Sequence, residues 1–133
     1  MSSTIGTEML TEREAQIMDV LWKLGTALAD DVRAALPGKP HDSTVRTLLR
    51  ILETKGYVSH DIRGKSYVYR PAVERAQAQR SAVRNFLGRL FGGSAENLVL
   101  RLIEDEVLTP DQLDQIRKSV QPRRPKRRPG GSS

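Results

Sequence analysis

A change of hydrophobic period within residues 43–70 constrains the fold more than any other feature of this chain. Apolar side chains recur with a helical period over residues 43–56 and with a strand period over residues 57–70. The predicted strands, residues 57–62 and 66–70, flank a short glycine-containing loop, which is typical of a β-hairpin. A helix that ends at a glycine and leads directly into a basic hairpin is typical of a winged helix-turn-helix domain.

The predicted helix has two chemically different faces. Its apolar stripe consists of Val45, Leu48, Leu49 and Leu52. Its other face carries arginines and short hydroxyl side chains with few carboxylates, and these groups can reach base edges or phosphates. The hairpin tip adds two cations that could lie along the phosphate backbone. We therefore predict DNA contacts from Ser43, Thr44, Arg46, Thr47, Arg50, Arg63 and Lys65. The alternatives are a solvated amphipathic helix and an ordinary charged turn.

The distribution of charge favours the same partner. The chain carries 22 Lys and Arg and 16 Asp and Glu, which gives a formal net charge of +6. Eleven cations and four acids fall within residues 39–89, whereas residues 1–38 and 90–121 each carry three cations and six acids. Because the positive charge is concentrated on the predicted recognition helix and hairpin, it resembles the electrostatic footprint of a nucleic-acid-binding protein.

The N-terminal residues complete a compact module. Thr11 and Glu14 have the spacing of a capping box, and Gly25 is expected to end the first helix. The apolar stripe of that helix is predicted to be Ala15, Met18, Leu21 and Trp22, with Ile17 beside it. Thr26 is the expected N-cap of a second helix. The buried side of this second helix is predicted to be Leu28, Val32, Ala35 and Leu36. Three helices and a hairpin make a module of roughly the smallest size that folds alone.

Residues 72–121 change to a purely helical pattern. Three short helices are predicted, and the third begins with Thr109 as N-cap and Pro110 at the first position. Such helices bury their apolar faces poorly in isolation, and the same segment of a second chain would cover them. The predicted dimer contacts are Val83, Phe86, Leu87, Leu90, Leu98, Val99, Leu102 and Ile103. The alternative is that these helices pack onto the winged helix as one monomeric core.

The sequence therefore predicts a mainly α protein with a small β-hairpin in four segments. These are a flexible N-terminus (1–7), a winged-helix DNA-binding domain (8–71), a helical dimerisation domain (72–121) and a basic disordered tail (122–133). The chain has no cysteine, which excludes disulfides and thiolate chemistry. His41 and His60 lack a neighbouring acidic cluster at metal-ligand spacing, and we interpret them as a loop residue and a hairpin surface residue. We expect no metal or other cofactor, no membrane insertion and a cytoplasmic location.

Several stretches carry a resemblance to the BlaI/MecI, or penicillinase repressor, family of bacterial regulators. The segment from Leu10 to Trp22 is similar to the opening helix of that family, and the segments 44–57 and 67–69 are similar to its recognition helix and wing. Asn85-Phe86, Gly92-Gly93 and Leu98-Val99-Leu100 resemble its dimerisation helices. The resemblance covers about residues 8–120 in order.

The resemblance implies a homodimeric transcriptional repressor that binds an inverted-repeat operator in double-stranded DNA. It further implies control of β-lactam resistance genes, with repression relieved when a membrane-bound sensor metalloprotease cuts the dimerisation domain. This chain has Arg101-Leu102 where well-studied relatives are cut at an Asn-Phe bond. It also lacks the C-terminal cysteines of the copper-responsive branch, which excludes copper sensing through thiolates.

Two other classes of function remain open on the sequence. A winged helix can serve as a protein-interaction module without a specific DNA target. An enzyme would need a nucleophile beside a base, a metal cluster or a glycine-rich phosphate loop, and the sequence shows none of these patterns.

Overall fold

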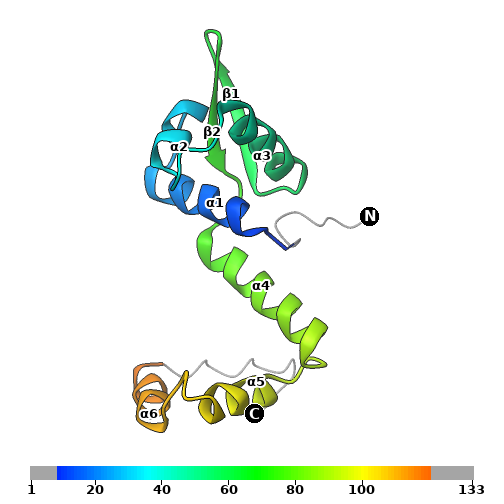
Figure 1. The fold of residues 1–133 in the computed structure, drawn as a ribbon, viewed down its shortest axis with the longest axis vertical. Coiled ribbons are helices and arrows are strands. Elements are labelled where there is room, and N and C mark those ends of the chain that lie inside the picture. The colour runs from blue at the N-terminus through cyan, green and yellow to red at the C-terminus, as the bar shows by residue number, and fades with distance from the viewer. Residues whose placement is uncertain (1–8, 121–133) are drawn as a thin grey trace, which may run out of the picture. The chain divides into compact units, whose positions relative to one another are not determined.

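The computed structural model describes residues 9–120, which divide into two compact units at Gly93 and Ser94. The predicted flexible N-terminus and basic tail lie outside the described residues. Within the first unit, helices α1 (Glu12–Leu24), α2 (Ala29–Ala35) and α3 (Asp42–Thr54) surround a hairpin, and helix α4 (Arg75–Leu90) follows it (Figure 1). The second unit contains helices α5 (Ala95–Glu104) and α6 (Pro110–Ser119). The predicted domain boundary at residue 71 remains a prediction.

The hairpin confirms the predicted change from helix to strand. Strand β1 (Val58–Arg63) pairs antiparallel with β2 (Ser66–Pro71), in a register that runs from Val58 opposite Pro71 to Arg63 opposite Ser66. Helix α3 ends where expected, because Gly56 has a φ of 86° that a residue with a side chain rarely adopts. The described residues thus form the predicted fold class, which is mainly helical with one small hairpin.

One core holds the first unit together. Side chains from α1, α2, α3 and the hairpin meet in it, and each helix contributes one apolar face. Its fully buried members are Ile17, Met18, Leu21, Val32, Val45, Leu49 and Leu52. These seven side chains fix the angles at which the three helices lie against one another, and so they hold the outer face of α3 in place.

The prediction that Thr26 caps α2 is wrong. The backbone N–H of Ala27 donates to the carbonyl of Tyr69 at 2.9 Å, and the N–H of Tyr69 donates back at 2.8 Å. This extended bridge adds a short third edge to the hairpin. Since Ala27 is extended, the helix can begin only later, at Ala29 after Leu28. The Asp31 carboxylate then accepts a hydrogen bond from the Leu28 N–H at 3.0 Å.

The later start also changes which side chains α2 buries. Ala29, Val32 and Leu36 are buried, whereas Leu28 and Ala35, which were predicted to be buried, are exposed. In α1 the capping box between Thr11 and Glu14 forms as predicted. The predicted stripe of α1 is displaced, however, because Ile17 lies at its centre while Ala15 is exposed. In both helices the sequence pattern allows more than one face to be buried, and tertiary packing determines which face it is.

The start of α4 is fixed to α1. The indole N–H of Trp22 donates to the Val73 carbonyl at 2.9 Å, and the Arg75 guanidinium lies 5.1 Å from the centre of the Trp22 ring. Arg75 also forms an ion pair with Asp19 at 3.0 Å, and Ala78 belongs to the core. The first turn of α4 is therefore part of the winged-helix body. Beyond Ala78, α4 has no buried residue.

The second unit has little core of its own. Neither α5 nor α6 has a buried residue. Thr109 caps α6 as predicted, since its hydroxyl accepts from the Gln112 N–H at 3.1 Å, and Pro110 follows at the first helical position. Two backbone hydrogen bonds close the turn between the helices, since the N–H groups of Val107 and Leu108 both donate to the Leu102 carbonyl. No helix among the described residues is long and apolar enough to cross a membrane.

Candidate nucleic-acid interface

The outer face of α3 carries every polar residue that the sequence predicted for it. Val45, Leu49 and Leu52 are buried on the inner face. On the outer face, Ser43, Thr44, Arg46, Thr47 and Arg50 are all exposed. The helix begins at His41, whose ring nitrogen accepts a hydrogen bond from the Ser43 N–H at 3.2 Å. His41 is therefore the N-cap of the predicted recognition helix, whereas the sequence indicated only a loop residue.

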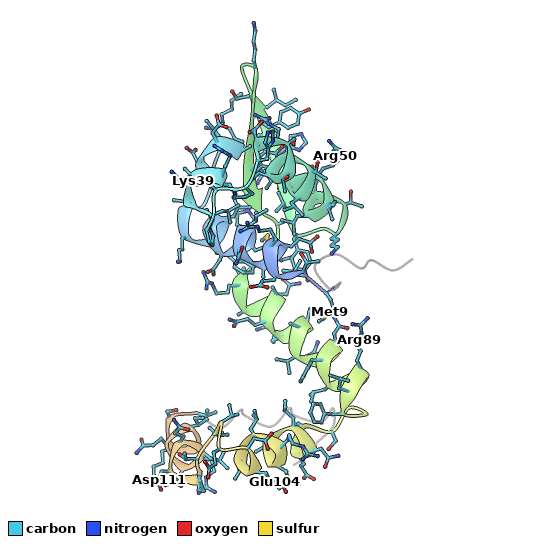
Figure 2. All side chains as sticks on the ribbon, viewed as in Figure 1. Met9, Lys39, Arg50, Arg89, Glu104 and Asp111 are labelled. Atoms are coloured by element: carbon cyan, nitrogen blue, oxygen red, sulfur yellow. The ribbon has the colours of Figure 1, made fainter. Side chains whose placement is uncertain are left out.

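Arg46 and Arg50 differ in how free they are. The Arg46 Nε donates to the Asp42 carboxylate at 2.9 Å, one helical turn earlier. This hydrogen bond, together with the Coulomb attraction of Asp42, raises the pKa of Arg46 above its ordinary value. Arg50 forms no ion pair with any residue between 9 and 120, and its side chain projects outward from α3 (Figure 2). Arg50 is thus available to an anion at once, whereas Arg46 is held in an extended position by its own helix.

The wing tip presents two more cations. Arg63 ends β1 and Lys65 precedes β2, and both side chains are exposed. Within the described part of the chain neither of them has an ionic partner. Further along the strands, Asp61 and Arg70 pair across the hairpin. The tip therefore offers two uncompensated positive charges, as the sequence predicted.

A groove of about 570 Å³ lies between the recognition helix, the wing and the start of α2. Arg46, Arg50 and Glu53 line it from α3, and His60, Lys65, Ser66, Tyr67 and Tyr69 line it from the hairpin. Leu28, Ala29 and Asp30 line it from α2. The structure thus brings three of the predicted DNA-binding cations, Arg46, Arg50 and Lys65, to one concave surface. Ser43, Thr44, Thr47 and Arg63 do not line this groove.

Sequence reasoning missed the centre of the groove. The His60 Nδ1 lies 2.8 Å from both carboxylate oxygens of Glu53, and its ring stacks on Tyr67 with centroids 4.2 Å apart. His60 is therefore half-buried and paired with Glu53, an arrangement that goes beyond the predicted role of a hairpin surface residue. The spacing of Glu53 and His60 gave no signal, because the turn at Gly56 decides which residue of β1 faces α3. Behind them Tyr69 is buried, and burial raises its pKa.

A second ion pair anchors the far end of α3. The Lys55 Nζ donates to Glu14 at 2.8 Å and to the Met9 carbonyl at 3.0 Å. Burial raises the pKa of Glu14, but hydrogen bonds from Lys55 and Thr11 and the charge of Lys55 outweigh burial, and so the pKa lies below its ordinary value. Glu14 is only 3% exposed and is thus a buried carboxylate held ionised by its partners. The pair fixes the C-terminal end of α3 against the start of α1.

The predicted dimer contacts lie on two helices. Val83, Phe86, Leu87 and Leu90 lie on α4, and Leu98, Val99, Leu102 and Ile103 lie on α5. None of these eight side chains is buried. The exposed fraction reaches 53% at Val83 and 70% at Leu90, values that are high for such large apolar residues. The described residues form no cluster of His, Asp and Glu that could hold a metal ion.

Comparisons with known proteins find relatives over most of this chain. The Methicillin resistance regulatory protein MecI of Staphylococcus aureus strain N315 is 26% identical over 113 residues, which covers 84% of this chain and 92% of that protein. The Penicillinase repressor of Bacillus licheniformis is 25% identical over 109 residues, covering 80% and 85%. A solved archaeal chromatin protein, TrmBL2, is a more distant likeness, with a TM-score of 0.47, 22% identity, and coverage of 87% of this chain and 40% of that one.

A family match covers a similar span of the chain. The model of the Penicillinase repressor family matches residues 10–122, which include the winged helix, α4, α5 and α6. The family is one of transcriptional repressors and not of enzymes, which confirms both the resemblance found in the sequence and the expectation that the chain is not an enzyme. The chain belongs to the penicillinase repressor family.

Proposed function

We propose that this protein represses transcription by binding an inverted-repeat operator in double-stranded DNA as a homodimer. One observation carries the DNA part of the proposal. Arginines of α3 and a lysine of the wing converge on one groove, which they line together with two acids, Asp30 and Glu53. A helix and a wing that present cations to the same side fit a duplex, whose backbone carries a regular array of phosphates.

The two elements have different roles in this proposal. The outer face of α3 enters the major groove, where Arg46 and Arg50 can each donate two hydrogen bonds to a guanine edge. Thr47, exposed between them, reaches a base edge or a phosphate. Arg63 and Lys65 at the wing tip contact phosphates, which adds affinity without reading sequence.

The wing's role is tested by the salt dependence of binding. The double variant Arg63→Ala/Lys65→Ala should weaken binding to any duplex. With fewer phosphate contacts, the association releases fewer counterions from the DNA. The slope of log affinity against log salt should fall by about 0.9 per lost contact. Fluorescence anisotropy with a labelled duplex, over a series of salt concentrations, measures that slope.

A matched control separates contact from general charge. Lys23 and Lys118 are exposed cations outside the groove, so Lys23→Ala/Lys118→Ala removes the same net charge. The control should lower affinity slightly and leave the slope nearly unchanged. An unchanged slope in the wing variant would remove the wing from the interface. Absence of duplex binding by the unaltered protein would favour a protein-interaction module instead.

The uncovered helices support the dimer part of the proposal. α4 beyond its first turn, α5 and α6 together have no buried side chain, yet α4 and α5 carry the eight large apolar residues predicted as dimer contacts. Their charges are also complementary. α4 has four arginines and no acid, whereas residues 94–120 have six acids and three cations. A second copy can therefore cover these faces with both apolar and ionic contacts.

A charge placed in the apolar stripe tests the dimer. Leu87→Glu and Leu102→Glu each put a carboxylate where a partner helix would lie, and each should convert the protein to monomers in sedimentation velocity. Gly88→Glu is the matched control, because a side chain built there meets no atom within 4 Å and lies on the opposite side of α4. That variant should stay dimeric. A wild-type chain that is monomeric at micromolar concentration and still binds a palindrome tightly would refute the dimer.

Repression and its relief follow from the dimer. Two reading heads held together bind two half-sites with a high effective concentration, so loss of the dimer releases the operator without damage to either head. We propose β-lactam resistance genes as the targets and cleavage of the C-terminal helices by a membrane-bound sensor metalloprotease as the signal. The bond that corresponds to the cut in relatives, Arg101–Leu102, lies within helix α5. Mass spectrometry of the protein recovered from induced cells would locate the cut.

A further inference from the structure

Glu53 and His60 join the recognition helix to the wing through their side chains. Glu53 lies in the last turn of α3 and His60 lies on β1. The His60 Nδ1 is 2.8 Å from each carboxylate oxygen, and Tyr67 stacks on the other side of the imidazole at an interplanar angle of 9°. The imidazole is thus clamped between an acid on the helix and an aromatic ring on β2. The pair thus links the side chains of the two elements that line the groove.

The pair sits among charges that favour a phosphate backbone. Arg46 and Arg50 line the groove from α3, and Lys65 lines it from the hairpin. Asp30 of α2 is the other carboxylate in the groove beside Glu53. The remaining titratable neighbours of His60 are Tyr67 and Tyr69, whose ring centroids lie 4.2 and 5.8 Å away. Glu53 is therefore an acid placed in a surface that otherwise attracts anions.

A carboxylate in a DNA-binding groove repels phosphates unless a cation neutralises it. His60 is the side chain that touches both carboxylate oxygens. A histidine changes charge between about pH 5 and pH 8, so the same pair is a neutralised ion pair at the acid end and an anion beside a neutral ring at the alkaline end. A bound duplex adds negative potential, which further favours the imidazolium form.

We infer that Glu53 and His60 are positioning residues for DNA binding, and that association with a duplex takes up a proton at His60. The inference rests on the proposed DNA-binding function. In the protonated state the pair holds the wing against α3 and presents no net charge to the phosphates. In the deprotonated state the charged hydrogen bond is lost and Glu53 faces the duplex uncompensated.

The test is the pH profile of affinity at constant ionic strength. Anisotropy with a random-sequence duplex between pH 5.5 and 8.5 should show affinity falling as the pH rises, by at most about tenfold per pH unit for one linked proton. His60→Gln should flatten that profile. His41→Gln is the comparison variant, because His41 is the chain's other histidine and does not touch Glu53. Since His41 caps the recognition helix, this variant can weaken binding at every pH, but it should keep the part of the slope that depends on His60.

Two further variants separate charge from packing. Glu53→Gln removes the exposed carboxylate, so it should bind more tightly than the wild type at pH 8.5 and show a smaller slope. The double variant Glu53→Gln/His60→Gln replaces the ion pair by two amides that can bond to each other, and it should regain affinity over His60→Gln while staying independent of pH. Circular dichroism at each pH verifies folding. If His60→Gln does not fold, the slope of Glu53→Gln decides.

The outcomes distinguish failure of this inference from failure of the proposed DNA-binding function. No binding to any duplex at any pH overturns the proposed function. Binding with the same pH slope in the wild type, His60→Gln and Glu53→Gln leaves that function intact and overturns the inference. A flattened slope in both variants, with the slope kept in His41→Gln, supports it.

Discussion

Removal of Lys55 should cost this fold more than removal of its partner. The Glu14 side chain is 3% exposed and that of Lys55 is 18% exposed, with 2.8 Å between Nζ and the carboxylate. Lys55→Met leaves the carboxylate buried with Thr11 as its main support, and a broken buried pair costs about 3–5 kcal/mol. Glu14→Gln keeps the Thr11 bond and leaves an ammonium that water can reach. It should cost about 1.5–3 kcal/mol, the value of a hydrogen bond to a charged group.

The double variant gives the sharper result. Glu14→Gln added to Lys55→Met removes the unpaired charge, so the double variant should be more stable than Lys55→Met alone, by about 1–3 kcal/mol. Urea titrations at one fixed protein concentration measure each free energy of unfolding, which keeps the contribution of assembly equal. A double variant that loses the sum of both single losses would refute the reasoning, because independent sites add and a shared charge does not.

The same pair predicts a pH dependence. The pKa of Glu14 lies below its ordinary value of 4.5, so its stabilising contribution is present above that value and is lost as the pH falls through the lowered pKa. In Lys55→Met the burial that raises the pKa remains, while the hydrogen bond and charge of Lys55 are gone. The stability gap between variant and wild type should therefore narrow between pH 7 and pH 5. A gap that stays constant would show that Glu14 remains ionised over this pH range in the folded variant, so that the loss of Lys55 does not raise its pKa into the range.

The remaining predictions concern the reading head and its link to α4. Arg46→Ala should lose about 1–3 kcal/mol of binding free energy on the cognate operator and much less on random duplex, measured by anisotropy, whereas equal losses would make Arg46 a phosphate contact. Trp22→Phe keeps the ring under Arg75 but removes the hydrogen bond to the Val73 carbonyl, so it should destabilise the protein by about 0.5–1.5 kcal/mol in urea titration.

Much of the fold could be predicted from local signals. The capping box of α1, the N-cap of α6, the glycine that ends α3 and the alternation of the hairpin each depend on residues close in sequence. The start of α2 could not be predicted in this way, because it depends on a bridge between Ala27 and Tyr69, which are far apart in the chain. Thr26 could cap α2 only if the helix began at Ala27, and here the bridge to Tyr69 keeps Ala27 extended.

The candidate site divides in the same manner. The exposed face of α3 and the cations of the wing tip follow from period and composition, so the sequence placed Arg50 and Lys65 on the surface correctly. The pair between Glu53 and His60 depends on how the hairpin folds back over the end of α3, and neither residue has a motif around it. The ion pair between Lys55 and Glu14 could not be predicted for the same reason, because its two residues lie 41 positions apart in the sequence.

In the proposed dimer, we expect the attachment of α4 to α1 to determine the spacing between the half-sites that the protein recognises. Trp22, Asp19 and Arg75 hold the first turn of α4 on the reading head, and the helix then runs for 16 residues, or about 24 Å. In the proposed dimer α4 connects the reading head to the partner chain. The contacts at the start of α4, and not the residues that touch DNA, would then set the distance between the half-sites. Substitutions at these contacts would yield repressors that recognise the same half-site with a different spacing between the two half-sites. Operators could then diverge in spacing while the recognition helix stays unaltered.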